Sequence, residues 1–218
     1  SKDRRDIDPK NNMGVPVTPQ VIFKNAKELL FLIDEVETLG YQSIDLNMGC
    51  PFPLQAKHGR GSGLLAHLDI VTEVADIIKA RPQLSFSVKM RLGWKNAEEW
   101  MPVLDILNDT PLTHIALHPR TGTQQYEGSI DVSAFAQFYE SCKHPLLYNG
   151  DLTTLKQLHE IEERYPRLGG LMIGRGLLAR PSLAQEYAEG GEWSHEEHIR
   201  ILRMLHTKLM EEYARIVK

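Results

Sequence analysis

The sequence predicts an α/β fold in which parallel strands are joined by crossover helices. The main observation is a regular alternation, repeated six times between residues 17 and 188, of short β-prone runs with segments of helical periodicity. The composition is that of a folded chain, with 42% apolar and 25% charged residues, which excludes disordered and collagen-like proteins. No apolar run approaches the roughly 20 residues that a membrane-spanning helix needs, so no membrane association is expected.

The first half of the chain provides three strand–helix units. Residues 17–23 form a β-prone run, although prolines weaken its start because proline has no N–H to give to a sheet. The helix predicted over residues 26–39 places Leu29 and Ile33 on one face, and Gly40 provides its C-terminal cap. The other elements predicted here are strands at 43–48 and 85–90, a helix at 68–80, and a weaker helix at 97–107 that contains Pro102.

The second half continues the same alternation and then changes character. A pair of glycines, Gly190 and Gly191, interrupts the chain, and Ser194 with Glu197 forms a capping box before a long amphipathic helix. We expect residues 1–188 to form the barrel domain and residues 192–218 to form the first helix of a C-terminal helical domain. The elements predicted before this break are strands at 114–117, 146–148 and 171–173, and helices at 133–142, 153–163 and 181–188.

Six such units fit either a doubly wound sheet or part of an eight-unit barrel. The first strand is not followed by the G-x-G-x-x-G pattern of dinucleotide-binding sheets, which favours the barrel. A complete (β/α)8 TIM barrel takes about 250 residues. We therefore expect a TIM barrel that is N-terminally incomplete in this chain, with two further units preceding Ser1.

Polar residues follow the predicted strands at the positions where a barrel carries its active site. The carboxyl ends of the strands form one rim, and catalytic residues gather there. A purely structural barrel has no need of polar side chains at so many strand ends, so their convergence predicts a functional site. These residues are Gln20, Asn47, Cys50, Lys89, Arg91, His118, Arg120, Asn149, Asp151, Gly174 and Arg175.

The chain has two cysteines, Cys50 and Cys142, which leave no disulfide framework or four-cysteine zinc site and fit a reducing cytoplasm. Cys50 lies directly after a predicted strand, in a loop rich in glycine. Such a thiol can act as a nucleophile or a general acid, or it can be a small buried apolar group. The proline and glycines after Cys50 favour a functional thiol, whereas Cys142 is expected to be a buried structural residue.

Residues 170–176 have the composition of a phosphate-binding loop. Glycines allow backbone N–H groups to approach an anion, and Arg175 supplies a positive charge. Lys89 on a neighbouring strand could stabilise negative charge on a cofactor ring, and His118 could hydrogen-bond a ring or phosphate oxygen. The pattern suits flavin mononucleotide, but spacing alone also allows a sugar-phosphate site.

Five motifs, taken together and in order, resemble those of the tRNA-dihydrouridine synthase family: IDLNMGCP, SVKMRLGW, IALHPRTGTQQYEG, LLYNGD and LMIGRG. The similarity covers about residues 16–181, and the helix after Ser194 is similar in position to that family's C-terminal helical domain. The resemblance implies an FMN-dependent barrel enzyme that reduces a specific uridine in tRNA to 5,6-dihydrouridine with NADPH as electron donor. It also implies tRNA as the partner and the cytoplasm as the location, with no obligate protein partner and no metal.

The resemblance also implies roles for individual residues. Cys50 would protonate C5 of the uracil, with hydride passing from flavin N5 to C6. A cation near the ring would stabilise the enolate-like charge of that step, and Arg91 could supply it. The FMN-binding residues would be Gln20, Lys89, His118, Asn149, Gly150, Asp151, Gly174 and Arg175, and the uracil-binding residues would be Asn47, Arg91 and Tyr126.

The chain departs from the family pattern in two respects. The first strand of the family, which contributes backbone contacts to the flavin, is not found in this sequence. Pro119 stands between His118 and Arg120, where a small residue or glycine is usual.

Two alternatives stay open at this stage. One is another FMN-dependent barrel oxidoreductase that acts on a small molecule, although the helical extension favours tRNA. The other is a catalytically silent RNA-binding or structural fragment. A zinc site at His195 and His198 is less favoured, because no third ligand lies nearby in the sequence.

Overall fold

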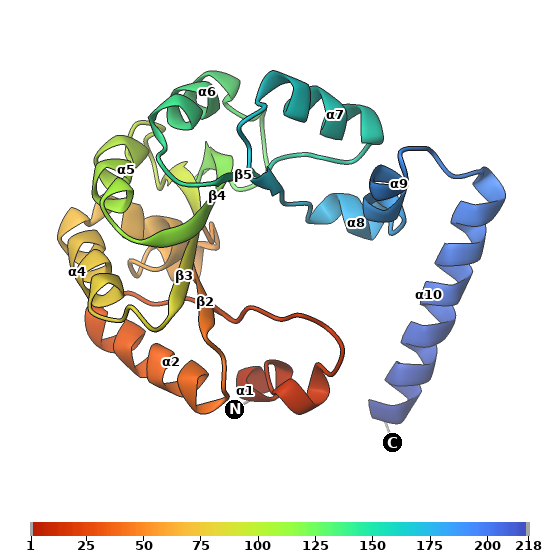
Figure 1. Cartoon of the computed structure of the whole chain (residues 1–218), viewed down its shortest axis with the longest axis horizontal. Helices are drawn as coiled ribbons and strands as arrows, with labels where there is room; N and C mark the ends of the chain where they lie inside the picture. Colours follow the sequence, from red (N-terminus) through yellow and green to blue (C-terminus); the bar gives the residue numbers. More distant parts are fainter. Residues whose placement is uncertain (1, 217–218) are drawn as a thin grey trace. The chain divides into compact units, whose positions relative to one another are not determined.

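The computed structural model describes residues 2–216 and places six strands in one sheet with the order β1-β2-β3-β4-β5-β6 (Figure 1). Each of the four pairs from β1 to β5 is parallel. Parallel strands in sequential order, each followed by a helix, form the wall of a (β/α) barrel, so the predicted fold class is confirmed. The strands are β1 (Gln20–Val21), β2 (Ser43–Met48), β3 (Ser85–Gly93), β4 (Leu112–Thr121), β5 (Leu146–Tyr148) and β6 (Gly170–Leu171).

The helices follow the predicted alternation, with additional short elements near the N-terminus and in the loops. The main helices are α2 (Ala26–Thr38), α4 (Leu68–Lys79), α5 (Trp100–Asn108), α6 (Val132–Ser141), α7 (Leu155–Arg164), α9 (Leu183–Glu189) and α10 (His195–Ile216). The short elements, which the sequence patterns did not predict, are α1 (Lys2–Asp6), η1 (Pro9–Asn11), α3 (Pro53–Ala56), η2 (Gly61–Ala66) and α8 (Arg175–Ala179).

Several element boundaries differ from the prediction for identifiable reasons. Helix α5 begins at Trp100, so Pro102 lies in its first turn, where a missing N–H breaks no helical hydrogen bond. The expectation that Pro102 weakens an interior position was therefore wrong. Strand β4 extends to Thr121, past its predicted end at residue 117, and therefore includes Pro119. The carbonyl of Pro119 accepts a hydrogen bond from the Asp131 N–H.

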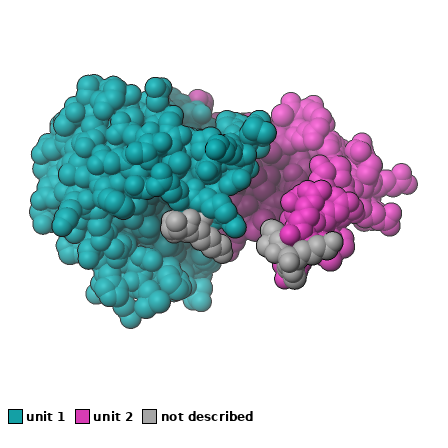
Figure 2. Space-filling view, turned by 90° about the horizontal axis from the view of Figure 1, so that it is seen from below, with its two compact units in different colours: residues 1–148, 167–170 teal, residues 149–166, 171–218 magenta. Residues whose placement is uncertain are grey.

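The chain divides into two compact units (Figure 2). Unit 1 comprises residues 1–148 and 167–170, and unit 2 comprises residues 149–166 and 171–218. This division concerns contacts within the chain, and the expected domain boundary near residue 188 stays a prediction. Each unit is described separately below.

In unit 1, alternate residues of each strand face opposite sides, and the two sides differ in polarity. Ile44, Leu46 and Met48 of β2 are fully buried, and so are Val88 and Met90 of β3. Helices α2, α4, α5 and α6 cover the strands on this side (Figure 1). The intervening residues, which are mostly polar, therefore lie on the other face of the sheet.

In unit 2, α10 begins at a capping box, as the sequence predicted. The Glu197 N–H donates to Ser194 Oγ at 3.3 Å, and the Ser194 N–H donates to Glu197 Oε2 at 2.8 Å. Much of the helix surface is exposed, including Leu209 and Tyr213. Among residues 2–216, none of the helices combines the length and the apolar character that crossing a bilayer requires.

Candidate active site

The register of β1 to β4 brings the polar residues of unit 1 into adjacent rows. Gln20 pairs with Asp45 across β1 and β2, and Asp45 pairs with Ser87 across β2 and β3. One step further along the strands, Asn47 pairs with Lys89. The next step places Arg91 beside His118. Residues two apart on a strand share a face. Seven residues of unit 1 were predicted to have a catalytic or binding role, and all except Tyr126 lie on these strands or, for Cys50, just after β2.

The first row is joined by short hydrogen bonds centred on Asp45, which is 8% exposed. Gln20 Nε2 donates to Asp45 Oδ2 at 2.6 Å, and Ser87 Oγ donates to Asp45 Oδ1 at 2.6 Å. Asn47 Nδ2 in turn donates to Gln20 Oε1 at 2.7 Å. Asp45 therefore fixes Gln20, and Gln20 fixes Asn47. Sequence reasoning missed Asp45, although its position two residues before Asn47 puts both on the same face.

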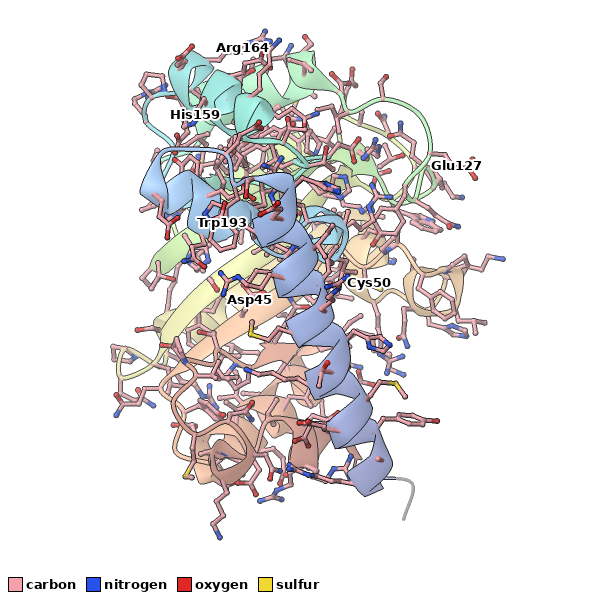
Figure 3. All side chains as sticks on the ribbon, turned by 90° about the vertical axis from the view of Figure 1, so that its right-hand side faces the viewer. Asp45, Cys50, Glu127, His159, Arg164 and Trp193 are labelled. Carbon is pink, nitrogen blue, oxygen red and sulfur yellow. The ribbon has the colours of Figure 1, made fainter. Side chains whose placement is uncertain are left out.

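Hydrogen bonds hold both backbone groups of Cys50, the residue labelled in Figure 3. Asn47 Oδ1 accepts hydrogen bonds from the N–H groups of Gly49 and Cys50, at 3.1 and 2.9 Å. The Cys50 carbonyl accepts from the N–H and the hydroxyl of Ser62, both at 3.0 Å. Ser62 is fully buried. The half-buried Cys50 side chain is thus presented by a rigid loop.

Gly61 packs directly against this cysteine. Its φ is +56°, and a Cβ at this position would lie 2.6–2.9 Å from the Cys50 carbonyl oxygen, Cβ and nitrogen. Only glycine fits such a close approach in the left-handed region. Gly61 therefore allows the loop to pack tightly against Cys50.

Lys89 is a charged residue on this face of the sheet, and its ammonium is available to a ligand. It is half-buried, and it forms no hydrogen bond or ion pair with any other residue of the described range 2–216. Burial lowers the pKa of Lys89, and the nearby Arg91 lowers it further, whereas Asp45 and Cys50 act in the opposite direction. An ammonium in this state is suited to a ligand that brings an acceptor or a negative charge.

Arg91 and Arg120 hold the loop between β4 and α6, and both are at most 2% exposed. Arg91 NH1 donates to the carbonyls of Thr121 and Gln125, at 2.8 and 2.6 Å. Arg120 NH2 donates to the Gly128 carbonyl at 2.7 Å. The two arginines thus fix the loop on both sides of Tyr126. Burial lowers the pKa of Arg91 to about 10, so its guanidinium is still charged at neutral pH.

Tyr126 itself is 53% exposed and lies near two of the predicted site residues. The Arg91 Cζ atom is 5.3 Å from the centre of its ring. The rings of Tyr126 and His118 are 6.2 Å apart between centroids, with a tilt of 38°. Tyr126, Arg91 and His118 therefore form one cluster, and their assignment to uracil and cofactor binding stays a prediction.

The remaining predicted residues lie in unit 2. Asn149 Nδ2 donates to the Met172 carbonyl at 2.8 Å, and Gly150 is buried. Arg175 is the first residue of α8, and its NH2 donates to Asp151 Oδ1 at 2.9 Å. Asp151 has a φ of +45°, an unusual conformation for a residue other than glycine. Gly174 precedes the helix as its N-cap and is exposed.

Cys142 was expected to be a buried structural residue, and the structure corrects this expectation of burial. It follows α6, is half-buried, and its Sγ lies 3.6 Å from the His144 carbonyl. Burial raises the pKa of the Cys142 thiol. A thiol with a raised pKa forms less thiolate, and the structural role of Cys142 stays a prediction.

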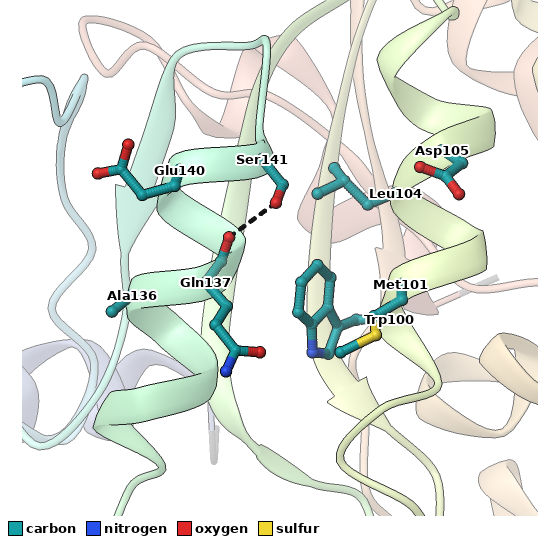
Figure 4. Close-up of a pocket in the computed structure, with 8 residues that line it drawn as sticks. All are labelled: Trp100, Met101, Leu104, Asp105, Ala136, Gln137, Glu140 and Ser141. Atoms are coloured by element: carbon teal, nitrogen blue, oxygen red, sulfur yellow. Dashed lines mark hydrogen bonds between the residues drawn. The ribbon is translucent and has the colours of Figure 1, made fainter.

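A separate pocket lies between α5 and α6, on the helical side of unit 1 (Figure 4). None of the predicted site residues lines it. Trp100 is 4% exposed, and its Nε1–H has no hydrogen-bond partner within the described residues. The lining residues are Trp100, Met101, Leu104, Asp105, Ala136, Gln137, Glu140 and Ser141.

Comparison with known proteins identifies the family. The family model for dihydrouridine synthase (Dus) matches residues 1–218, the whole chain. The chain belongs to the dihydrouridine synthase family. The resemblance that the five sequence motifs carry is thereby confirmed.

Curated relatives agree with this assignment. A probable tRNA-dihydrouridine synthase of Helicobacter pylori (strain J99) is 34% identical over 164 residues, which are 73% of this chain and 47% of the relative. A probable tRNA-dihydrouridine synthase of Staphylococcus aureus (strain Mu50) is 32% identical over 188 residues, which are 82% of this chain and 55% of the relative. The chain therefore spans about half the length of these relatives.

Solved barrel structures share the fold at low sequence identity. A morphinone reductase mutant in complex with tetrahydroNAD has a TM-score of 0.51 and 13% identity, over 77% of this chain and 49% of that one. The N-(5'-phosphoribosyl)anthranilate isomerase of Pyrococcus furiosus has a TM-score of 0.50 and 16% identity, over 86% of this chain and 78% of that one. These similarities support the partial barrel and carry no information on chemistry.

Proposed function

We propose that this chain forms the catalytic part of an FMN-dependent tRNA-dihydrouridine synthase, which reduces a specific uridine in tRNA to 5,6-dihydrouridine with NADPH as electron donor. Family membership supports the reaction class. The observation that carries the proposal is the cluster of unit 1, where Cys50 lies in the same site as the ammonium of Lys89, which has no hydrogen-bond or ion-pair partner among residues 2–216. The thiol can supply a proton to the uracil, and the cation can stabilise negative charge on the reduced flavin.

The donor groups of unit 1 suit a flavin ring. A flavin carries carbonyl oxygens and ring nitrogens that accept hydrogen bonds, and charge near N1 tunes its reactivity. Lys89 would face that acceptor edge, because it has a charge and three donors and no bonding partner among residues 2–216. Gln20, held by Asp45, and His118 would donate to other ring positions.

In unit 2, the residues that start α8 would hold the phosphate of FMN. Arg175 supplies a positive charge, and Gly174 leaves room for backbone N–H groups to approach the anion. Asn149, Gly150 and Asp151 would contact the ring or the ribityl chain. Asp151 would also orient Arg175, since the two side chains already form an ion pair at 2.9 Å.

The proposed chemistry assigns the proton to Cys50. When bound and reduced by NADPH, FMN supplies the electrons for the reduction as a hydride to C6 of the uracil. The Cys50 thiol donates its proton to C5, so that the C5–C6 double bond becomes a single bond and the resulting thiolate recovers a proton from water. Charge on the uracil is stabilised by Arg91, whose pKa of about 10 keeps it cationic throughout.

Asn47 and Tyr126 complete the proposed uracil site. Asn47 has a double role, because its Oδ1 already fixes the Cys50 loop. The exposed ring of Tyr126 offers a surface on which an extruded base can stack. A uridine within folded tRNA must leave its stack to reach the half-buried thiol of Cys50. Helix α10 (His195–Ile216) would begin the helical domain that contacts tRNA. A tRNA substrate also suggests a cytoplasmic location.

An anaerobic titration tests the proposal. The purified protein is loaded with FMN, reduced with NADPH, and mixed with unmodified tRNA, with free uridine or with uracil, while flavin absorbance is followed. Reoxidation by tRNA alone is the expected result. Equal reoxidation by free uridine or uracil would instead indicate a small-molecule oxidoreductase, and a protein that cannot be loaded with flavin would indicate a silent fragment.

A further inference from the structure

Arg120 is a buried arginine whose contacts reach a predicted cofactor-binding residue. It lies on β4, two residues after His118, and is 2% exposed. Arg120 NH1 lies 3.0 Å from His118 Nε2. Its Nε and NH2 donate to the Gly128 carbonyl at 3.3 and 2.7 Å. The guanidinium is therefore fixed by the loop at one side and meets the imidazole at the other.

This contact determines which nitrogen of His118 carries the proton. A guanidinium has five N–H donors and no acceptor, so Arg120 must donate in this hydrogen bond. His118 Nε2 must then be the acceptor, and an imidazole nitrogen accepts only when it carries no hydrogen. In a neutral imidazole the other nitrogen carries the hydrogen. The doubly protonated ring is excluded as well, because it has no acceptor nitrogen.

We propose that Arg120 is a positioning residue that fixes His118 as the neutral tautomer with its hydrogen on Nδ1. His118 then has one N–H donor in a fixed ring orientation. Toward FMN, this inference rests on the proposed function, in which His118 contributes to cofactor binding. The tautomer itself follows from the Arg120 contact alone.

The surroundings of His118 in unit 1 favour the same state. Arg91 of β3 is its partner in the strand register, and Arg120 of β4 touches its ring. Both neighbours are cations, and a third positive charge on the imidazole would be repelled by them. Tyr126 from the loop faces the ring at 6.2 Å. Pro119 adds rigidity between the two residues because its φ is restricted.

Nitrogen-15 NMR of the histidine rings tests the proposal on the native protein. The chain contains nine histidines, and a His118→Gln variant assigns the His118 signals by their loss. At neutral pH we expect Nε2 of His118 to have the shift of an unprotonated nitrogen and Nδ1 that of a protonated one. The reverse pattern, or an imidazolium pattern, would overturn the proposal.

Two substitutions separate tautomer control from a merely structural role. Arg120→Met should release His118 to a mixture of tautomers and weaken FMN binding by about tenfold. Arg120→Lys should keep the native tautomer, because an ammonium is also a donor without an acceptor. As a matched control, Arg167→Met removes an exposed arginine of unit 1 that pairs with Glu140, and should leave the His118 signals unchanged.

An unchanged His118 tautomer in a folded Arg120→Met protein would contradict the proposal. If Arg120→Met does not fold, the native spectrum and that of Arg120→Lys still decide the tautomer. Native protein that binds no FMN would sink the proposed function, whereas the ring spectra would still report on Arg120.

Discussion

Two charged side chains, Glu186 in unit 2 and Lys89 in unit 1, illustrate opposite ways of placing a charge inside this protein. Glu186 is fully buried and is surrounded by donors. Arg180 binds it through two nitrogens, Ser182 Oγ donates at 2.5 Å, the Trp193 N–H at 2.9 Å, and His198 Nε2 lies at 3.0 Å. Lys89 has no such partner among residues 2–216.

The two pKa shifts reflect this difference. Arg180 above all, together with Ser182, the Trp193 N–H and His198, holds the pKa of Glu186 far below its usual range. Burial lowers the pKa of Lys89, which means that the fold disfavours its charge. Glu186 is structural because its carboxylate forms its hydrogen bonds within the chain. These bonds connect α9 to the start of α10. A charge that the fold disfavours is retained for a ligand.

Removal of the buried carboxylate should have the largest effect on stability. Glu186→Ala leaves Arg180, Ser182 and the Trp193 N–H without their acceptor, so we expect a loss of about 3 kcal/mol in the free energy of unfolding. Glu192→Ala is the control, because Glu192 pairs with the same Arg180 at 3.6 Å but is exposed. It should cost less than about 1 kcal/mol. Urea denaturation of both variants measures the difference, and equal losses would show that Glu186 is not a structural centre.

Removal of the open ammonium should weaken ligand binding and spare the fold. Lys89→Met should lower the affinity for FMN by about 10- to 100-fold, because a charge-assisted hydrogen bond is lost. The free energy of unfolding should stay the same or rise. Lys79→Met, at the exposed end of α4, controls for the loss of one positive charge. Isothermal titration gives the affinities, and a Lys89→Met protein that binds FMN normally would refute the assigned role.

The frame that presents Cys50 can be tested by adding one methyl group. Gly61→Ala places a Cβ within 3 Å of the Cys50 backbone, in addition to the strain of a φ of +56°. Gly40→Ala is a matched control, because its φ is +86° but no atom lies within 4 Å. Gly61→Ala should therefore be less stable than Gly40→Ala by about 1.5 kcal/mol. Gly61→Ala should also slow tRNA reduction while the affinity for FMN stays unchanged. Equal stability and activity of the two variants would mean that the loop rearranges to accept the methyl group, which would contradict the prediction.

The pH dependence of stability sharpens the same comparison. A carboxyl whose pKa is depressed in the folded state stabilises the protein above its unfolded pKa of about 4.3, and this contribution is lost as the pH falls toward the folded pKa. The stability gap between the native protein and Glu186→Gln should therefore be constant near neutrality and smaller by about 1 kcal/mol at about pH 3.6. Urea midpoints across this range measure the gap, and a gap that widens in acid would contradict the assignment.

Much of the architecture could be predicted from the sequence because strand and helix periodicity are local signals. The strand at 43–48 was predicted to the residue, and so was the one at 146–148. The short helix α8 was missed because its five residues, RGLLA, give no periodic signal, and their glycine argues against a helix. Strand β4 extends past its predicted end because it pairs with β3 on both sides of Pro119 and Arg120, at His118 and at Thr121.

The sequence predicted which polar residues gather at the strand ends, but it did not predict the hydrogen bonds and packing contacts that join them. Residue type and position at strand ends pointed to Cys50 and Lys89 together. Asp45 was missed because a carboxylate inside a strand looks, in sequence, like any solvent-facing residue. The roles of Ser62 and Gly61 depend on contacts 11 or 12 positions from Cys50, and no periodicity encodes such contacts.

The central claim is tested most directly by measuring the dihydrouridine content of tRNA. The tRNA comes from cells that lack the parent gene and are complemented with the native gene or with a Cys50→Ala version. Cys142→Ala is the matched control, because it removes the other thiol. Mass analysis of the tRNA should find dihydrouridine restored by the native gene and by Cys142→Ala. With Cys50→Ala, one uridine should stay unreduced although the protein still binds flavin. Full restoration by Cys50→Ala would contradict the assignment of this thiol as the proton donor.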